Sequence, residues 1–358
     1  MIKKFFIFLI LISCNNYLPT KINNNYTIDN NIIINDIIHI KEGGVLSINS
    51  DYKIKLKKNS GFLIDGGVLN LKGNFYDSLI IKPKNILKIK IINNGKLKVF
   101  KTSIYNSSII SNNSEIEIIK SNILSKNLFL DLNNSNLYID SCYIKGYKKK
   151  FNFSSLVNSK ILINNTIIKN FNNSFLLDSC NSFIINNSIL KYIEKECFLI
   201  KNSDNITLSN CIFLENNLII NSENSDLRVF NNLIIKNEFF SKLNFGSSLF
   251  LINNTFDSNK NIITANKGKN KIISKNNILY NTLNYFDLNN NSYLSNSFCV
   301  YNKDTLFGYY NIKSDPNFID PINYDYNLKT NSPAKRAANN NTNIGVNTNT
   351  INIIKYLN

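Results

Sequence analysis

The sequence predicts an all-β protein, a right-handed parallel β-helix solenoid of about twelve coils. Three observations predict this fold. A five-residue phrase recurs at a nearly constant spacing, short alternating strands precede its copies, and no segment shows the period of an amphipathic helix. Together they indicate coils of 22 or 23 residues, each made of two or three short strands joined by turns.

The recurring phrase consists of a polar residue, Asn or Ser, a small residue and two apolar residues. Its clearest copies begin 22, 23, 22, 22 and 22 residues apart. Less regular copies extend toward the N-terminus, and the Gly-Gly-Val-Leu segments at 43–46 and 66–69 place the first coil near residue 31. The clearest copies lie at 164–168, 186–190, 209–213, 231–235, 253–257 and 275–279.

Short strands with alternating apolar residues precede the phrases, as in Ile161-x-Ile163 and Ile206-x-Leu208. A second apolar piece lies between phrases, for example at 175–177 and 198–200. Alternation with β-branched residues indicates a strand with one buried face. Coils stacked about 4.8 Å apart would form a continuous core of Ile, Leu and Phe in a rod on the order of 60 Å long.

Small and amide side chains at the bends fit such stacking. Asn tolerates left-handed backbone and forms amide ladders between coils. Cys142 and Cys211 occupy the coil position that Thr166, Ser188 and Thr255 hold in other phrases. We interpret both cysteines as small stacking residues rather than redox groups.

A leucine-rich repeat is the alternative architecture. The series Leu137-x-Ile139-x-x-Cys142-x-Ile144 fits the second half of that consensus at a permitted period. The first half is missing, because no regular Leu stands three residues before the strand and the following segment is a second strand.

The N-terminus predicts export and a lipid anchor. Lys3 and Lys4 precede an apolar run at 5–12 that is too short to span a bilayer. The following Leu-Ile-Ser-Cys at 11–14 resembles the lipobox of bacterial lipoproteins, which implies that Cys14 becomes a lipid-modified N-terminus. The alternative is an ordinary secretory signal. We expect the protein to lie in the cell envelope, anchored to a bacterial membrane and most simply to the outer membrane. The sequence leaves open which side of that membrane it faces.

Composition excludes several classes of function. The net charge of +17 suggests a protein that binds nucleic acid. Such recognition favours arginine, however, and the chain has only two arginines, Arg228 and Arg336, while its lysines are dispersed. We attribute the charge to a bias toward A/T-rich codons and expect no nucleic-acid partner. His39 is the only histidine, which excludes a histidine-based metal site or triad, and no C-x-x-C spacing suggests zinc.

The repeats at 95–302 resemble right-handed β-helix repeat proteins, whose architecture pectate lyases share. The tail is similar to the closing segment of many secreted bacterial β-helix proteins, although Lys335-Arg336-Ala337 departs from the pattern. We expect this tail to cover the open end of the helix, with residues 31–60 covering the other end. The matching series is D-P-N-F-I-D-P at 315–321, D-Y-N-L at 325–328, S-P-A at 332–334 and I-G at 344–345.

The resemblance leaves the chemistry open, because this solenoid serves lyases, hydrolases, epimerases and adhesins. A uronate lyase needs a basic residue and acidic residues that bind Ca²⁺, and the best local candidates are Asp204, Glu223, Asp226 and Arg228. The alternative explanation, which we favour, is two turn aspartates and a solvated arginine, since turns are where Asp is commonest. For a hydrolase, the carboxylate pairs are Glu115 with Glu117 and Glu194 with Glu196; for sugar stacking, the outer-face tyrosines are Tyr143, Tyr147, Tyr192, Tyr280 and Tyr285.

We therefore predict a noncatalytic lipoprotein of the cell envelope, a structural or binding module with polysaccharide as the expected ligand and no cofactor. The alternative is a carbohydrate-active enzyme of the pectate-lyase-like superfamily, a polysaccharide lyase or glycoside hydrolase, which would use Ca²⁺ if it is a lyase. The predicted organisation is a signal peptide at 1–13, a tether at 14–30, the β-helix at 31–310, a capping segment at 311–346 and a tail at 347–358.

Overall fold

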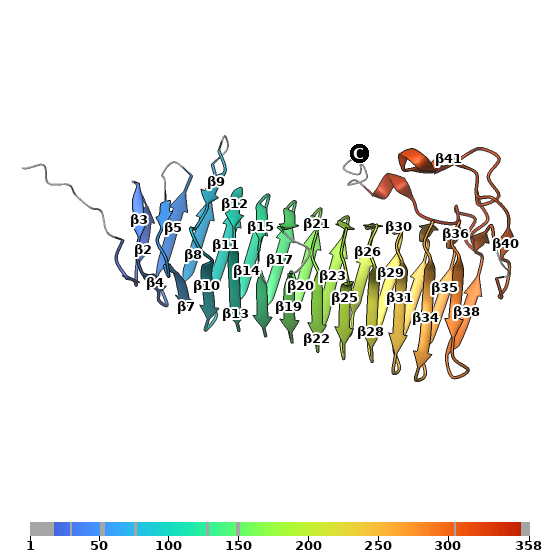
Figure 1. Ribbon diagram of the computed structural model, residues 1–358, viewed down its shortest axis with the longest axis horizontal. Coiled ribbons are helices and arrows are strands. Elements are labelled where there is room, and N and C mark those ends of the chain that lie inside the picture. Colours follow the sequence, from blue (N-terminus) through green and yellow to red (C-terminus); the bar gives the residue numbers. More distant parts are fainter. Residues whose placement is uncertain are drawn as a thin grey trace, which may run out of the picture.

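The computed structural model describes residues 18–28, 31–50, 54–74, 77–126, 129–147, 151–303 and 306–351. Over these residues the chain is a parallel β-solenoid of about twelve turns, and Figure 1 shows their strands side by side along one rod. The predicted β-helix is thus confirmed. The leucine-rich-repeat alternative is wrong, because each turn supplies strands to three sheets. The predicted signal peptide and Cys14 lie outside the described residues.

Three long parallel sheets, which we call A, B and D, each take one strand from a complete turn. Sheet A consists of β1 (Lys21–Ile22), β4 (Ile37–Ile40), β7 (Gly61–Asp65), β10 (Leu87–Ile92), β13 (Ser107–Asn112), β16 (Leu130–Asn133), β19 (Ser154–Val157), β22 (Phe175–Asp178), β25 (Glu196–Lys201), β28 (Leu218–Glu223), β31 (Phe239–Asn244), β34 (Asn261–Lys267) and β37 (Asn284–Leu288).

Sheet B is equally long and runs beside it. It consists of β2 (Asn25–Ile28), β5 (Val45–Asn49), β8 (Val68–Lys72), β11 (Lys96–Phe100), β14 (Glu115–Ile119), β17 (Asn136–Asp140), β20 (Lys160–Asn164), β23 (Ser182–Asn186), β26 (Ile206–Ser209), β29 (Asp226–Phe230), β32 (Ser248–Ile252), β35 (Lys271–Lys275) and β38 (Tyr293–Ser297).

Sheet D forms the third side. It consists of β9 (Leu79–Ile81), β12 (Thr102–Tyr105), β15 (Asn122–Ser125), β18 (Tyr143–Gly146), β21 (Ile167–Lys169), β24 (Ile189–Lys191), β27 (Ile212–Leu214), β30 (Leu233–Ile235), β33 (Thr255–Asp257), β36 (Ile278–Tyr280), β39 (Val300–Tyr301) and β40 (Ile312–Lys313). Two short pairs complete the strands: β3 (Ile32–Ile34) with β6 (Ile54–Leu56), and antiparallel β41 (Phe318–Asp320) with β42 (Asp325–Leu328). The described helices are two 3₁₀ turns, η1 (Pro321–Asn323) and η2 (Thr348–Thr350).

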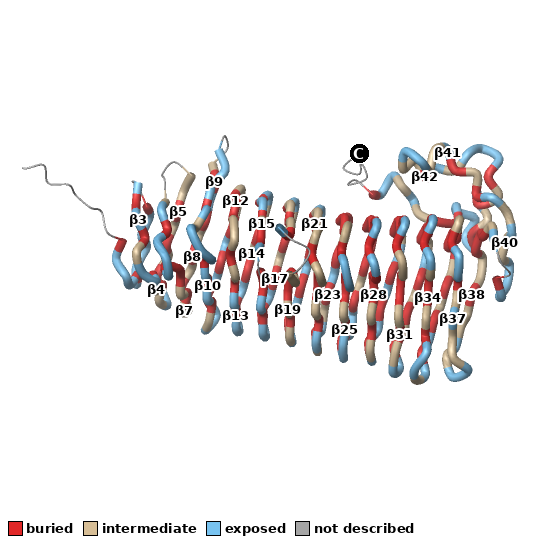
Figure 2. Tube along the Cα trace, in the orientation of Figure 1, coloured by how far each residue is buried: buried red, intermediate tan, exposed pale blue. Residues whose placement is uncertain are grey.

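Alternating inward side chains fill the rod. Figure 2 shows buried and less buried residues alternating along the strands of turn after turn. Phenylalanines stack along the axis in the middle turns: the ring centroids of Phe175 and Phe198 lie 5.5 Å apart with an interplanar angle of 9°. No helix in the described part of the chain is long and apolar enough to cross a membrane.

Residues with left-handed backbone conformation form the corners between sheets B and D. An Asn pays little for positive φ, so an Asn-rich chain can turn sharply at every coil. Positive φ angles between 47° and 56° occur at the equivalent corner residues Ser141, Asn165, Asn187, Asn210, Asn231, Asn253 and Asn276.

A ladder of buried polar side chains follows these corner residues, and we call it the corner ladder. From Ser121 onward, the side-chain oxygen of each Ser, Thr or Asn member accepts a hydrogen bond from a backbone N–H of the preceding turn. Thr166 N–H donates to Ser188 Oγ at 3.1 Å, and Asn232 N–H donates to Asn254 Oδ1 at 2.9 Å. The ladder therefore satisfies backbone groups that a tight corner would otherwise leave buried and unpaired. Its members include Thr102, Ser121, Cys142, Thr166, Ser188, Cys211, Asn232, Asn254 and Asn277.

The cysteines behave as small stacking residues, with one correction. Cys142 N–H donates to Thr166 Oγ1 and Cys211 N–H donates to Asn232 Oδ1, so both belong to the corner ladder. Thr255 does not, because it pairs with Leu233 in sheet D one position later. In the phrase at 253–257 the ladder residue is the second one, Asn254, whereas in the phrase at 186–190 it is the third one, Ser188.

The solenoid starts earlier than predicted. Strand β1 pairs with β4, and β2 pairs with β5, so the chain is already coiled at residue 21. The predicted tether at 14–30 is therefore too long. Only Ile28 of β2 is buried, which leaves the segment looking polar in sequence.

The closing segment also differs from its prediction. Residues 318–351 do not cover the open end of the solenoid; they turn back along the outer face of sheet D, as the red part of Figure 1 shows. Strands β27 and β30 are consequently buried on both faces. Gly345 has φ of +89°, and a Cβ there would lie 2.5 Å from Ile278 Cδ1, so this approach needs glycine.

A buried polar pair fastens the closing segment to the solenoid. Tyr326 Oη donates to Asp257 Oδ2 at 2.6 Å, and Asp257 Oδ1 also accepts from Ser258 Oγ at 2.8 Å. Burial and the adjacent Asp257 carboxylate raise the pKa of Tyr326 well above its usual range. The phenol thus stays protonated and serves as a donor at all physiological pH values.

Candidate functional site

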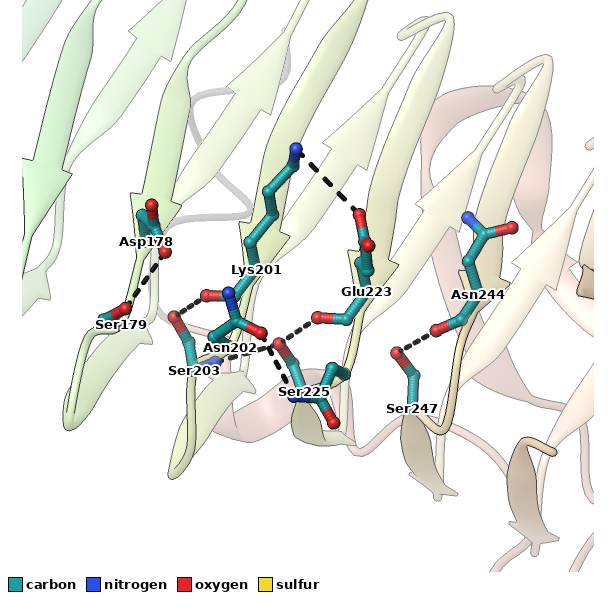
Figure 3. A network of polar contacts seen from close by, with 10 residues as sticks. Asp178, Ser179, Lys201, Asn202, Ser203, Glu223, Ser225, Asn244 and Ser247 are labelled. Atoms are coloured by element: carbon teal, nitrogen blue, oxygen red, sulfur yellow. Dashed lines mark hydrogen bonds and ion pairs between the residues drawn. The ribbon is translucent and has the colours of Figure 1, made fainter. Parts of the chain in front are cut away.

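The predicted corner cluster does not converge on one point. Glu223 ends β28 on sheet A, and its carboxylate faces Lys201 of β25 at 3.9 Å (Figure 3). Asp226 starts β29 on sheet B, beyond the corner that Ser225 makes. Glu223 and Asp226 therefore lie on different faces of the solenoid.

The two aspartates occupy equivalent places in successive turns, as their spacing suggested. Asp204 N–H donates to Cys180 O, and Asp226 N–H donates to Ser203 O. Both side chains are exposed in the turn that leads into sheet B. Such turns are where aspartate commonly occurs for structural reasons.

Arg228 points outward from sheet B, away from Glu223. In register it lies between Thr207 and Phe250 of the neighbouring strands. Within the described ranges, no group of three or more His, Cys, Asp and Glu side chains is placed to hold a metal ion. A cation at this corner would have to rely on main-chain and amide oxygens as well.

The other acidic and aromatic candidates are mostly scattered. Glu194 precedes β25, so it does not share a strand face with Glu196. Tyr143 lies on sheet D and Tyr285 is buried on sheet A, so the five tyrosines form no common strip. His39 is on β4 near the N-terminus.

Glu115 and Glu117, in contrast, do share the outer face of β14 and line a depression in sheet B. This hollow has a volume of about 560 Å³ and crosses strands β11 to β23. A second hollow of about 490 Å³ lies toward the N-terminus, and both are lined by Lys98 and Glu117. We call the two together the sheet B groove, which crosses eight strands from β2 (Thr27) to β23 (Ile184).

The centre of the sheet B groove is a row of outward side chains held by strand register. Lys98, Glu117, Tyr138 and Leu162 are direct neighbours on β11, β14, β17 and β20. Parallel register keeps neighbouring side chains about 4.8 Å apart, so a charged pair, an aromatic ring and an aliphatic side chain form one continuous surface.

Lysines outnumber carboxylates in the groove. Lys72, Lys96, Lys98 and Lys160 line it, against Glu115 and Glu117. Lys96 Nζ lies 2.7 Å from Glu115 Oε2, and both side chains are about half exposed. The remaining amines give the groove a positive field that favours an anionic ligand.

A polar hollow of about 610 Å³ lies between the closing segment and the B–D corner. Amide side chains dominate its lining, and Arg336 is its one cationic side chain among the described residues. Asn347 N–H donates to Asn231 Oδ1 at 2.6 Å across it. This hydrogen bond across the hollow thus helps to hold the closing segment against the solenoid.

The cysteines should be inert in the native protein. All five described cysteines are free and buried. Burial raises the pKa of Cys142 and of Cys211 to about 12, and that of Cys299 to about 11. Because the thiolate is the reactive form, a Cys14→Ser chain at pH 8 should show almost no reaction with a disulfide reagent until urea unfolds it. Rapid labelling of a folded thiol would contradict this burial.

No family model and no curated protein matches the chain. Among solved structures, the periplasmic alginate epimerase AlgG is similar at 10% identity and a TM-score of 0.25, covering 71% of this chain and 77% of that one. The surface adhesin PfbA of Streptococcus pneumoniae is similar at 12% identity and a TM-score of 0.32, covering 76% and 85%. The strand pairing within the chain itself establishes that it is a parallel β-helix protein.

Proposed function

We propose that the chain is a noncatalytic lipoprotein of the cell envelope, anchored through Cys14, which binds an anionic polysaccharide along the sheet B groove. The observation that carries the proposal is the continuity of the two hollows through Lys98 and Glu117. Seven strand intervals of about 4.8 Å give the groove a length of about 34 Å. An extended polymer of several sugar units fits that length better than a small compact ligand does.

The side chains supply the interactions that such a polymer needs. Lysines attract carboxylate or sulfate groups, the ring of Tyr138 offers an apolar face to a sugar ring, and Asn70 and Asn136 offer amides to hydroxyls. Every one of these groups stands on a strand, so the backbone that carries them is already ordered before binding.

Tyr138→Ala should weaken binding of polygalacturonate about tenfold, because it removes the aromatic face at the centre of the groove. Titration calorimetry of the full-length Cys14→Ser chain would measure this, with neutral dextran as the uncharged comparison. Tyr293→Ala is a matched control, since Tyr293 is an exposed tyrosine on β38 of the same sheet outside the groove. Equal losses in the two variants, or no binding by the parent chain, would refute the proposal.

The enzyme alternative keeps one specific observation in its favour. Glu115 and Glu117 are both outward on one strand that crosses the groove, and residues two apart on a strand lie about 6.6 Å apart. Inverting hydrolases separate their carboxyl groups by about 6.5–9.5 Å. Release of reducing ends, lost in Glu117→Gln, would support a hydrolase. Calcium-dependent release of unsaturated uronate, lost in Asp226→Ala, would support a lyase at the corner cluster.

A further inference from the structure

A third hollow lies on sheet A near the N-terminal end of the rod. Its volume is about 770 Å³, within the range of pockets that hold small ligands. Strands β4, β7, β10 and β13 form its floor, and the turns before β7 and β10 form its walls. We call it the sheet A groove; its lining includes Ile37, Gly61, Leu63, Ile86, Lys88 and Ile110.

The floor of the sheet A groove carries apolar side chains that are open to solvent. Ile37 is 48% exposed and Ile110 is 44% exposed, although both stand on regular strands of the sheet. Gly61 lies between Ile37 and Lys88 in register, and a Cβ there would lie 2.4 Å from Lys88 O. The close approach of the Lys88 carbonyl thus requires glycine at this position. Exposed apolar side chains gathered around a hollow mark a binding surface.

The groove is also cationic, because lysines stand among its apolar side chains: Lys90 on β10 is in register between Leu63 and Ile110. Lys84, Lys88 and Lys90 line the groove, and no carboxylate lines it among the described residues. Asp65, further along β7, accepts hydrogen bonds from Lys41 and Asn93, which lower the pKa of its carboxyl group. The acid is thus already paired, and the three amines remain as the charges that a ligand meets.

The groove lies at the end of the rod where the chain enters it. Strand β4, which carries Ile37, pairs directly with β1, the first strand of the sheet. The 17 residues before the described part of the chain contain the apolar run at 5–12 and Cys14. Attachment through either feature would bring this end of the solenoid to a membrane surface.

We propose that the sheet A groove binds an anionic membrane lipid, with an acyl chain over Gly61, Leu63 and the exposed isoleucines and the phosphate at the lysines. Apolar side chains beside lysines are the composition of surfaces that sit in the headgroup region. The interaction would hold the rod against the bilayer next to its anchor. It does not involve the sheet B groove. A failure of vesicle binding would therefore leave the polysaccharide proposal intact, and a failure of polysaccharide binding would leave this one intact.

Flotation with vesicles tests the proposal. The full-length Cys14→Ser chain should bind vesicles of equimolar phosphatidylglycerol and phosphatidylcholine, and bind pure phosphatidylcholine much more weakly. Replacing Lys84, Lys88 and Lys90 by Glu should weaken partitioning onto the anionic vesicles tenfold or more, since each lysine near an anionic surface adds favourable energy. Ile37→Ser with Ile110→Ser should also weaken it, and this loss should persist in high salt, which screens only the charges.

A matched triple variant controls for net charge. Lys267→Glu, Lys269→Glu and Lys271→Glu change the charge equally at the far end of the rod, and this chain should bind like the parent. All variants keep the same N-terminus, so its own affinity for vesicles cancels. Equal losses in both triple variants, or no preference for anionic vesicles, would overturn the proposal. Binding of dodecanoate, a free single-chain amphiphile, without binding of vesicles would also overturn the proposal, because the groove would then accept only free amphiphiles.

Discussion

Asn254→Ala should destabilise the solenoid by at least about 3 kcal/mol, because it leaves several buried polar groups without partners. Asn254 is fully buried in the corner ladder. Its Oδ1 accepts from the N–H and from the Nδ2 of Asn232, and its Nδ2 donates to Val229 O at 2.9 Å. A buried donor or acceptor left unsatisfied costs about 1–3 kcal/mol, and this change strands more than one.

Urea unfolding followed by circular dichroism would measure the loss. Asn217→Ala is the matched control, because Asn217 is exposed and its amide donates only to Glu194 O, and we expect it to change stability by less than about 0.5 kcal/mol. Asn254→Ser should fall between the two, since serine fills the same ladder position at Ser188. If Asn254→Ala were no worse than Asn217→Ala, the ladder would not contribute to stability as described.

Ending the chain at residue 313 should abolish soluble expression, because the closing segment covers an apolar stretch of sheet D. Ile212, Leu233, Ile235 and Val300 lie beneath it and are each at most 1% exposed. Full burial of such a side chain contributes about 1.5–3 kcal/mol, so the four together rival the whole unfolding free energy of an ordinary domain, about 5–15 kcal/mol. The uncovered face would also favour association between chains.

A point substitution tests the same interface without deleting it. Tyr326→Phe removes only the hydroxyl that donates to Asp257 and should cost about 1.5–3 kcal/mol, the value of a hydrogen bond to a charged group. Tyr324→Phe, in the same segment and only partly buried, should cost less than about 0.5 kcal/mol. A soluble, β-rich chain that ends at residue 313 would show that sheet D needs no cover.

The site could be predicted only in part. The spacing of Glu115 and Glu117 places both on one face of a strand, and the structure bears this out. Their partners could not be read from the sequence, because Lys98 and Tyr138 become neighbours of Glu117 only through the register of three successive turns, which are 19 and 21 residues apart. The prediction that Asp204, Glu223, Asp226 and Arg228 form one site was wrong because proximity in sequence did not become proximity in space. Glu223 and Asp226 are three residues apart, but the corner at Ser225 places them on different sheets.

The repeat, the all-β character and the stacking of small residues at the corners can all be predicted without coordinates, because period, alternation and the tolerance of Asn for left-handed backbone are local properties. Where the closing segment lies was decided only in three dimensions. The two apolar residues of each phrase point to opposite sides of a strand, so Phe213 enters the core while Ile212 faces outward and needs a cover. A repeat can show that such a stripe exists, but which distant segment covers it depends on contacts such as Tyr326 with Asp257, 69 residues apart.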